Sequence, residues 1–157
     1  MRTLDYLNLD SKGANYVATE LKQLLADLQV FYTNLRGFHW NIVGKQFFQL
    51  HEKFEDLYDN INEKADEIAE RILVLGQKPE NKFSEYLKVS GIKEIDNISN
   101  GEDALKNILE SYKYFIALES KILKVASEAG DESTVAIMSD YIKEQEKLVW
   151  MITARLS

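Results

Sequence analysis

The sequence predicts an all-α fold, a four-helix bundle with one long crossover between the second and third helices. Apolar residues recur at steps of three and four over four long stretches, and glycines separate these stretches. Such steps follow from 3.6 residues per turn and are typical of amphipathic helices. The length of 157 residues, 45% of them hydrophobic and 29% charged, suits one domain spanning residues 1–157.

The first two helices are expected over residues 14–36 and 45–75. The first carries an apolar stripe that runs from Val17 to Phe38, and the second carries one from Phe47 to Leu75. The short connection around Gly44 predicts an antiparallel hairpin. Gly76 directly follows the second stripe, which is typical of a residue that caps a helix at its C-terminal end.

The segment 76–101 differs from the rest of the chain. It holds the only proline, three of the seven glycines and a short apolar patch at Phe83, Tyr86 and Leu87. At about 25 residues it is too long for a tight turn, so it predicts a crossover that carries a short helix of its own. The last two helices are expected over 102–129 and 131–157, separated by Gly130. This arrangement is a ferritin-like plan.

Composition excludes several classes of protein. No apolar run approaches the roughly 18–20 residues of a membrane span, and the start, MRTLDYLNLD, lacks the basic and apolar segments of an export signal. The chain has no cysteine, which rules out disulfides and thiolate metal sites and fits a cytoplasmic protein. A net charge of −7 favours a cation as partner over the phosphate backbone of a nucleic acid.

Two histidines flank the first turn. In an antiparallel hairpin centred near Lys45, His39 and His51 lie equally far from the turn, so their imidazoles are expected to face each other. Carboxylates follow on the same side of the second helix, one turn beyond His51 and again further along as an i, i+4 pair. The candidate metal-ligating residues are His39, His51, Glu55, Asp66 and Glu70.

These ligands lie about 130° from the apolar stripe of their helix, so they do not point into the bundle core. The inward-facing Glu-x-x-His motif of a usual di-iron bundle is absent. His51 and Asp66 are separated by about 22 Å of helix at 1.5 Å per residue, too far for one ion with ligands about 2 Å away. Two copies of this helix packed antiparallel, with a twofold axis between Tyr58 and Asp59, would solve this. One half of each site would then come from one chain, through His39, His51 and Glu55. The other half would come from its mate, through Asp66 and Glu70.

The run FHWNIVGKQFFQLHEKFEDLYDNINEKADEIAERI (38–72) closely resembles the Dps family, the DNA-protecting miniferritins, and the resemblance extends over nearly the whole chain. His39, Trp40, His51, Asp66 and Glu70 stand at the spacings of the family motif. The resemblance implies a dodecameric shell built from twofold dimers, with at most two irons at each inter-subunit ferroxidase site. It implies that ferrous iron is oxidised, preferably by hydrogen peroxide and otherwise by oxygen, and stored as ferric mineral, which protects against oxidative damage.

Several candidate site residues have a structural role as the alternative to a functional one. Imidazole and carboxylate together suit ferrous iron, but from spacing alone a metal site and ordinary structural or solvated side chains are equally open. Glu55 departs from the family, which more often has Asp there, so the second iron position is expected to be shifted or weaker. The resemblance suggests that Trp40 is an accessory electron donor, and a packing role for this indole is at least as well supported.

The last helix and the residues just before it carry further acidic side chains. A group around the last helix either lines a cation pore of the shell or forms a solvated face: Glu128, Asp131, Glu132, Asp140 and Glu144.

Residues 1–13 balance two basic against two acidic side chains, and the closing ITARLS holds one arginine, so we expect no direct DNA binding near neutral pH. The alternatives to an iron-oxidising store are a DNA-binding shell with a vestigial iron site, and a helical module that binds a partner protein through the 45–75 face.

Overall fold

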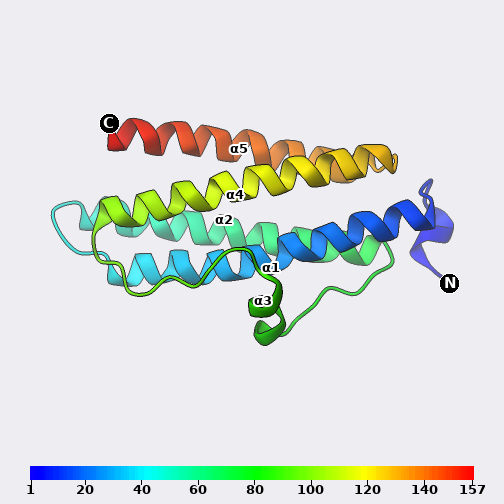
Figure 1. Cartoon of the computed structure of the whole chain (residues 1–157), viewed down its shortest axis with the longest axis horizontal. Coiled ribbons are helices and arrows are strands. Elements are labelled where there is room, and N and C mark those ends of the chain that lie inside the picture. Colours follow the sequence, from blue (N-terminus) through cyan, green and yellow to red (C-terminus); the bar gives the residue numbers. More distant parts are fainter.

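The computed structural model describes all 157 residues and confirms an all-helical bundle with a crossover that carries a short helix. A short 3-10 helix, Thr3–Tyr6, precedes five α-helices: α1 (Ser11–Asn41), α2 (Phe47–Val74), α3 (Phe83–Val89), α4 (Gly101–Glu128) and α5 (Glu132–Leu156). The four long helices lie side by side, and the crossover runs back along the bundle with α3 standing off its flank (Figure 1). None of the helices is both long and apolar enough to span a membrane.

The first helix is longer than its glycines suggest. It begins at Ser11, where the Asp10 carboxylate accepts a hydrogen bond of 2.8 Å from the backbone N–H of Gly13, and it continues through Gly37 to Asn41. A helical glycine costs about 1 kcal/mol relative to alanine, and the buried residues on both sides of Gly37 offset this cost. The expected bounds of 14–36 were therefore too short at both ends.

The remaining turns follow the prediction. Gly44, Gly76 and Gly130 have φ angles of +108°, +82° and +70°, which side chains with a Cβ rarely adopt. They stand in the turn before α2, just after α2 and just before α5. Leu75 ends the buried stripe of α2, so Gly76 is the predicted cap.

The core is one cluster of 34 buried apolar residues, most of them on the four long helices, with Tyr86 of α3 and Ile92 of the crossover also included. At its centre, the ring of Phe31 on α1 packs against Tyr112 and Phe115 on α4, with ring centroids 5.5 and 5.2 Å apart. Both apolar stripes of the hairpin are buried, as their periodicity predicts. The opposite face of α2 is thereby left outside the core.

A buried carboxylate fixes the crossover to the bundle. Asp27 on α1 is 0% exposed and accepts hydrogen bonds from the Ser90 hydroxyl (2.9 Å), the Gly91 backbone N–H (2.8 Å) and the Tyr114 hydroxyl (2.8 Å). A Cβ at Gly91 would lie 2.3 Å from the Tyr114 hydroxyl oxygen, so only glycine allows this close approach. These contacts hold α3 beside α1.

Candidate functional site

The two imidazoles face each other across the hairpin, as predicted. The rings of His39 and His51 are stacked with centroids 3.7 Å apart and planes inclined by 15°. The Nδ1 atom of each ring lies 2.7–2.8 Å from the backbone carbonyl oxygen of the other histidine. Because a carbonyl only accepts hydrogen bonds, each Nδ1 carries the proton and donates it. The Nε2 lone pair of each neutral ring is therefore the one left for a metal ion.

Neighbouring rings hold this histidine pair in place. His39 is 7% exposed and His51 is half-buried. The ring of Phe47 stacks on His51 at 4.8 Å, and the ring of Tyr58 meets His39 edge to face at 5.3 Å. The paired hydrogen bonds also join the end of α1 to the start of α2. The arrangement thus closes the hairpin and fixes both imidazoles with the same contacts.

The candidate carboxylates lie outside the core. Glu55, Asp66 and Glu70 are all exposed on α2, on the face opposite to its buried stripe. No group of three or more histidine, aspartate or glutamate side chains within one chain could hold a metal ion. A single chain therefore brings the two histidines together but does not bring Asp66 and Glu70 to them.

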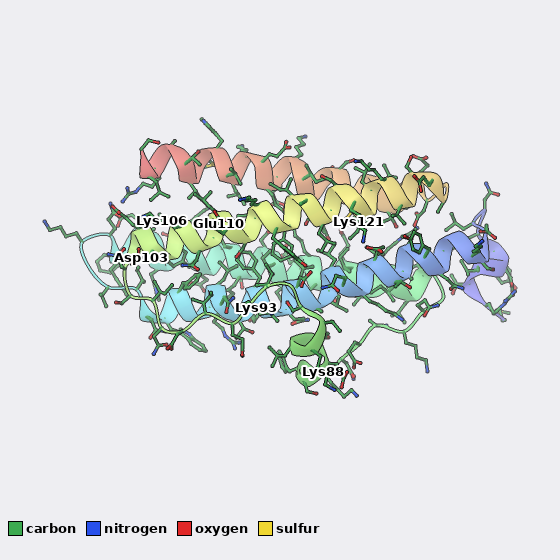
Figure 2. The ribbon with its side chains drawn as sticks, in the orientation of Figure 1. Lys88, Lys93, Asp103, Lys106, Glu110 and Lys121 are labelled. Carbon is green, nitrogen blue, oxygen red and sulfur yellow. The ribbon has the colours of Figure 1, made fainter.

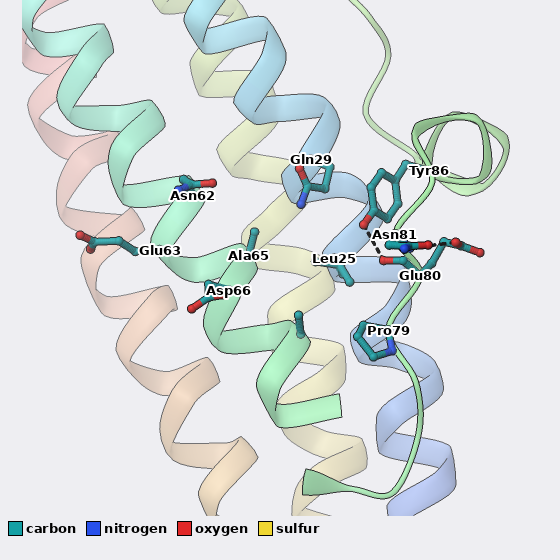
Figure 3. Close-up of a pocket in the computed structure, with 11 residues that line it drawn as sticks. Leu25, Gln29, Asn62, Glu63, Ala65, Asp66, Pro79, Glu80, Asn81 and Tyr86 are labelled. Carbon is teal, nitrogen blue, oxygen red and sulfur yellow. Dashed lines mark hydrogen bonds between the residues drawn. The ribbon is translucent and has the colours of Figure 1, made fainter. Parts of the chain in front are cut away.

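A pocket of mixed polar and apolar lining adjoins Asp66. It measures about 430 Å³ and lies between α1, α2 and the start of the crossover. Leu25 and Gln29 come from α1, Asp66 and its neighbours from α2, and Pro79 to Asn81 from the crossover (Figure 3). The Tyr86 hydroxyl donates a hydrogen bond of 2.5 Å to the backbone carbonyl oxygen of Glu80 and closes one side.

Trp40 is a surface residue in the single chain. Its side chain is 65% exposed, so it does not belong to the core. The Arg36 guanidinium lies over the indole at 4.8 Å and over the Tyr32 ring at 5.2 Å. A cation on the face of an aromatic ring is held by the quadrupole of the ring.

The acids proposed for a pore fall into two groups. Asp131 is 1% exposed, accepts from the backbone N–H of Thr134 at 3.0 Å as the cap of α5, and pairs with Arg71 at 2.6 Å. This corrects its assignment, since a side chain buried within its own chain cannot line a pore. Glu144 is bound by Lys64 at 2.5 Å and by the side-chain amide of Asn60 at 2.8 Å. Glu144 is nevertheless 43% exposed, and the remaining members are exposed as well: Glu128, Glu132 and Asp140.

The sequence did not predict a buried polar pair inside the bundle, Glu119 and Gln145. Glu119 on α4 is 0% exposed and Gln145 on α5 is 1% exposed, and the Gln145 amide donates to the Glu119 carboxyl at 2.8 Å. Burial raises the pKa of Glu119 to about 8. Oε2 of Glu119 and Oε1 of Gln145 have no hydrogen-bond partner while Glu119 is ionised. The available signal was that Glu119 lies at core spacing between Phe115 and Ile122.

Known proteins share the sequence pattern and the fold of this chain. The family model for the ferritin-like domain matches residues 18–157. The DNA protection during starvation protein of Porphyromonas gingivalis is 50% identical over 98% of this chain and 96% of its own length. A Dps protein from Vibrio cholerae O1, described as one of a broad superfamily of ferritin-like diiron-carboxylate proteins, has a TM-score of 0.93 and 48% identity over 95% of this chain and 94% of its own. Antigen TpF1 from Treponema pallidum has a TM-score of 0.91 and 34% identity over 94% of this chain and 96% of its own.

The bundle, its long crossover and the domain match define a protein of the ferritin-like class. Within that class the chain belongs to the Dps family, with relatives of that name matching nearly its full length. The resemblance drawn from the run 38–72 is confirmed.

Proposed function

We propose that this protein is a ferroxidase and iron store, which binds ferrous iron at sites shared between two subunits, oxidises it and keeps the ferric product inside a closed shell. The observation that carries the proposal is the stacked histidine pair, in which both Nδ1 atoms donate to backbone carbonyls and both Nε2 atoms are left as ligands. Iron is here substrate and cargo.

The shared site rests on the placement of the carboxylates. His39, His51 and Glu55 of one subunit would supply one half, and the partner's Asp66 and the partner's Glu70 would supply the other. Support comes from the exposure of all three carboxylates on one face of α2 and from the lack of a complete ligand cluster in one chain. Antiparallel packing of α2 on its copy would satisfy both observations.

The donor set suits the chemistry. Imidazole nitrogen is a good ligand for ferrous iron, whereas carboxylate oxygen favours the harder ferric ion. Hydrogen peroxide accepts two electrons, so two ferrous ions and two protons give two ferric ions and two waters. The carboxylates would then pass ferric iron to the mineral, and oxygen would serve as the slower oxidant. Removing ferrous iron and peroxide together would protect DNA without contact.

The assembly and location belong to the same proposal. A dodecamer built from twofold dimers would enclose the mineral, and the exposed acids Glu128, Glu132 and Asp140 would draw cations toward its openings. A cytoplasmic location is proposed because ferrous iron is available there and the chain has no cysteine.

Anaerobic titration with ferrous iron, followed by addition of peroxide, tests this function. We expect saturable ferrous binding at no more than two ions per subunit, fast oxidation, and a ferric core that stays in solution with the protein. Oxidation no faster than in buffer, with no retained iron, would favour a DNA-binding shell or a partner-binding module instead.

Glu55 is expected to govern the second iron. Glu55→Ala should lose the weaker of the two ferrous binding steps and keep the stronger, because both histidines and the partner's carboxylates remain. Glu55→Asp should keep both steps, since the carboxylate is retained on a shorter side chain. Calorimetric titration under anaerobic conditions measures both. Two steps of unchanged affinity in the alanine variant would remove Glu55 from the site.

We expect no binding of duplex DNA at neutral pH. Affinity for a phosphate backbone comes from counterion release by clustered lysine and arginine, whereas this chain carries a net charge of −7. Lys88, Lys93, Lys106 and Lys121 are spread over α3, the crossover and α4, with Asp103 and Glu110 among them (Figure 2). A gel shift with metal-free protein at moderate salt checks this, and a tight complex would favour the nucleoid-binding alternative.

A further inference from the structure

A row of aromatic rings leads away from the histidine pair. His51 stacks on His39 at 3.7 Å, the Tyr58 ring meets His39 at 5.3 Å, and the Tyr32 ring meets Tyr58 at 5.6 Å. The two tyrosine contacts are edge to face, with interplanar angles of 84° and 79°. Both tyrosines are half-buried. The row therefore joins α1 and α2 beside the candidate iron site through direct ring contacts.

Trp40 is placed less favourably for giving up an electron. It reaches this row only through Arg36, whose guanidinium covers both the indole at 4.8 Å and the Tyr32 ring at 5.2 Å. A fixed positive charge opposes the removal of an electron from the ring beneath it, because two like charges then lie close together. Tyr58 touches the His39 ring itself, and its oxidised form becomes neutral when the phenolic proton leaves.

We propose that Tyr58, rather than Trp40, donates the second electron to peroxide when a site holds a single ferrous ion, with Tyr32 as its positioning residue. The proposal rests on the ferroxidase function above. Hydrogen peroxide takes one electron from ferrous iron and one from the phenol. Ferrous iron, peroxide, tyrosine and one proton from solvent give ferric iron, a tyrosyl radical and two waters.

This step has a protective consequence. With one ferrous ion and no second donor, the O–O bond of peroxide breaks to give hydroxide and a free hydroxyl radical. Transfer of the Tyr58 hydrogen atom, as electron and proton, converts that radical to water while it is still beside the site. The oxidising equivalent then stays on a half-buried ring and does not reach solvent.

Freeze-quench electron paramagnetic resonance tests the assignment. Protein loaded anaerobically with less ferrous iron than one ion per site is mixed with peroxide, with and without ring-deuterated tyrosine. The wild type should give a radical whose hyperfine pattern changes on deuteration. Tyr58→Phe, which keeps the ring against His39, should lose this signal and release more hydroxyl radical to a spin trap. Trp40→Phe and the control Tyr16→Phe, an exposed tyrosine on α1, should both retain the signal.

The outcomes separate the two proposals. A tyrosyl signal that persists in Tyr58→Phe, or a wild-type radical that disappears only in Trp40→Phe, overturns the role of Tyr58 while iron oxidation proceeds. Normal iron oxidation in the wild type without any tyrosyl radical also overturns it. Absence of iron oxidation in the wild type overturns the ferroxidase function and this inference together. Tyr32→Ala, which removes the ring that packs edge to face on Tyr58, should keep the radical but change its hyperfine splittings, because the Tyr58 ring loses the neighbour that sets its angle.

Discussion

His51→Ala and Asp66→Ala are each expected to abolish rapid oxidation of ferrous iron, and chains carrying one change each are expected to recover part of it when mixed. Each substitution removes one ligand from every shared site. Neither residue belongs to the buried stripe of α2, so the bundle should form in both variants. His51→Ala also loses the hydrogen bond to the His39 carbonyl, a cost of about 1 kcal/mol.

Recovery follows from the geometry of a twofold dimer. In a dimer with one chain of each variant, one site carries both changes and the other site carries neither. Random pairing of equal amounts makes half of the dimers mixed, so about a quarter of the sites should be intact. Co-expression and stopped-flow oxidation provide the measurement. Glu52→Ala, an exposed carboxylate beside His51, is the matched control and should keep full activity. Mixed dimers that remain inactive would show that each site lies within one chain.

Glu119→Gln is expected to stabilise the protein at neutral pH. Burial raises the pKa of Glu119 from 4.5 to about 8 in the folded chain. Between these pH values the unfolded chain binds fewer protons than the folded chain, so the free energy of unfolding falls as the pH rises through this window. One pKa unit is worth about 1.4 kcal/mol, which makes the penalty on the order of 3 kcal/mol at pH 7. An amide at position 119 removes this penalty and can exchange two hydrogen bonds with Gln145.

Denaturant unfolding between pH 5 and 9 at fixed protein concentration measures the effect. The free energy of unfolding of the wild type should fall as the pH rises toward 8. Glu119→Gln should have a higher free energy of unfolding at pH 7, and this free energy should change less with pH across the range. Glu110→Gln, whose side chain is 77% exposed, serves as the control and should follow the wild type. Equal pH dependence in the wild type and Glu119→Gln would contradict a protonated Glu119.

Hydrophobic periodicity was enough to predict the bundle, the crossover and the exposed face of α2 that carries the candidate ligands. The facing histidines were predictable because antiparallel helices place residues equally far from a turn at the same height. The helix ends were less predictable: a capping carboxylate at Asp10 lets α1 begin before Gly13, and a glycine within a long helix costs little against its packing.

Polar residues inside the bundle were not predicted. Asp27 and Glu119 stand at positions that the apolar periodicity of their helices assigns to the core. An acid at such a position is expected to be exposed unless buried hydrogen-bond partners for it are known. Those partners are far away along the chain, such as Ser90 and Gly91 for Asp27 and Gln145 for Glu119. Asp131 was misassigned for the same reason, because its ion pair with Arg71 spans 60 residues of sequence. Such contacts depend on how the helices pack, which periodicity within one helix does not record.

The central claim, an iron site shared between two subunits, is tested most directly by anomalous diffraction at the iron edge from crystals loaded with ferrous iron under anaerobic conditions. The proposal predicts an anomalous peak beside the Nε2 atoms of His39 and His51 of one subunit, with Asp66 of the partner subunit and Glu70 of the partner subunit reaching the same iron position. Iron bound by residues of one chain only, or a peak inside the bundle beside Glu119 with none at the histidines, would contradict it.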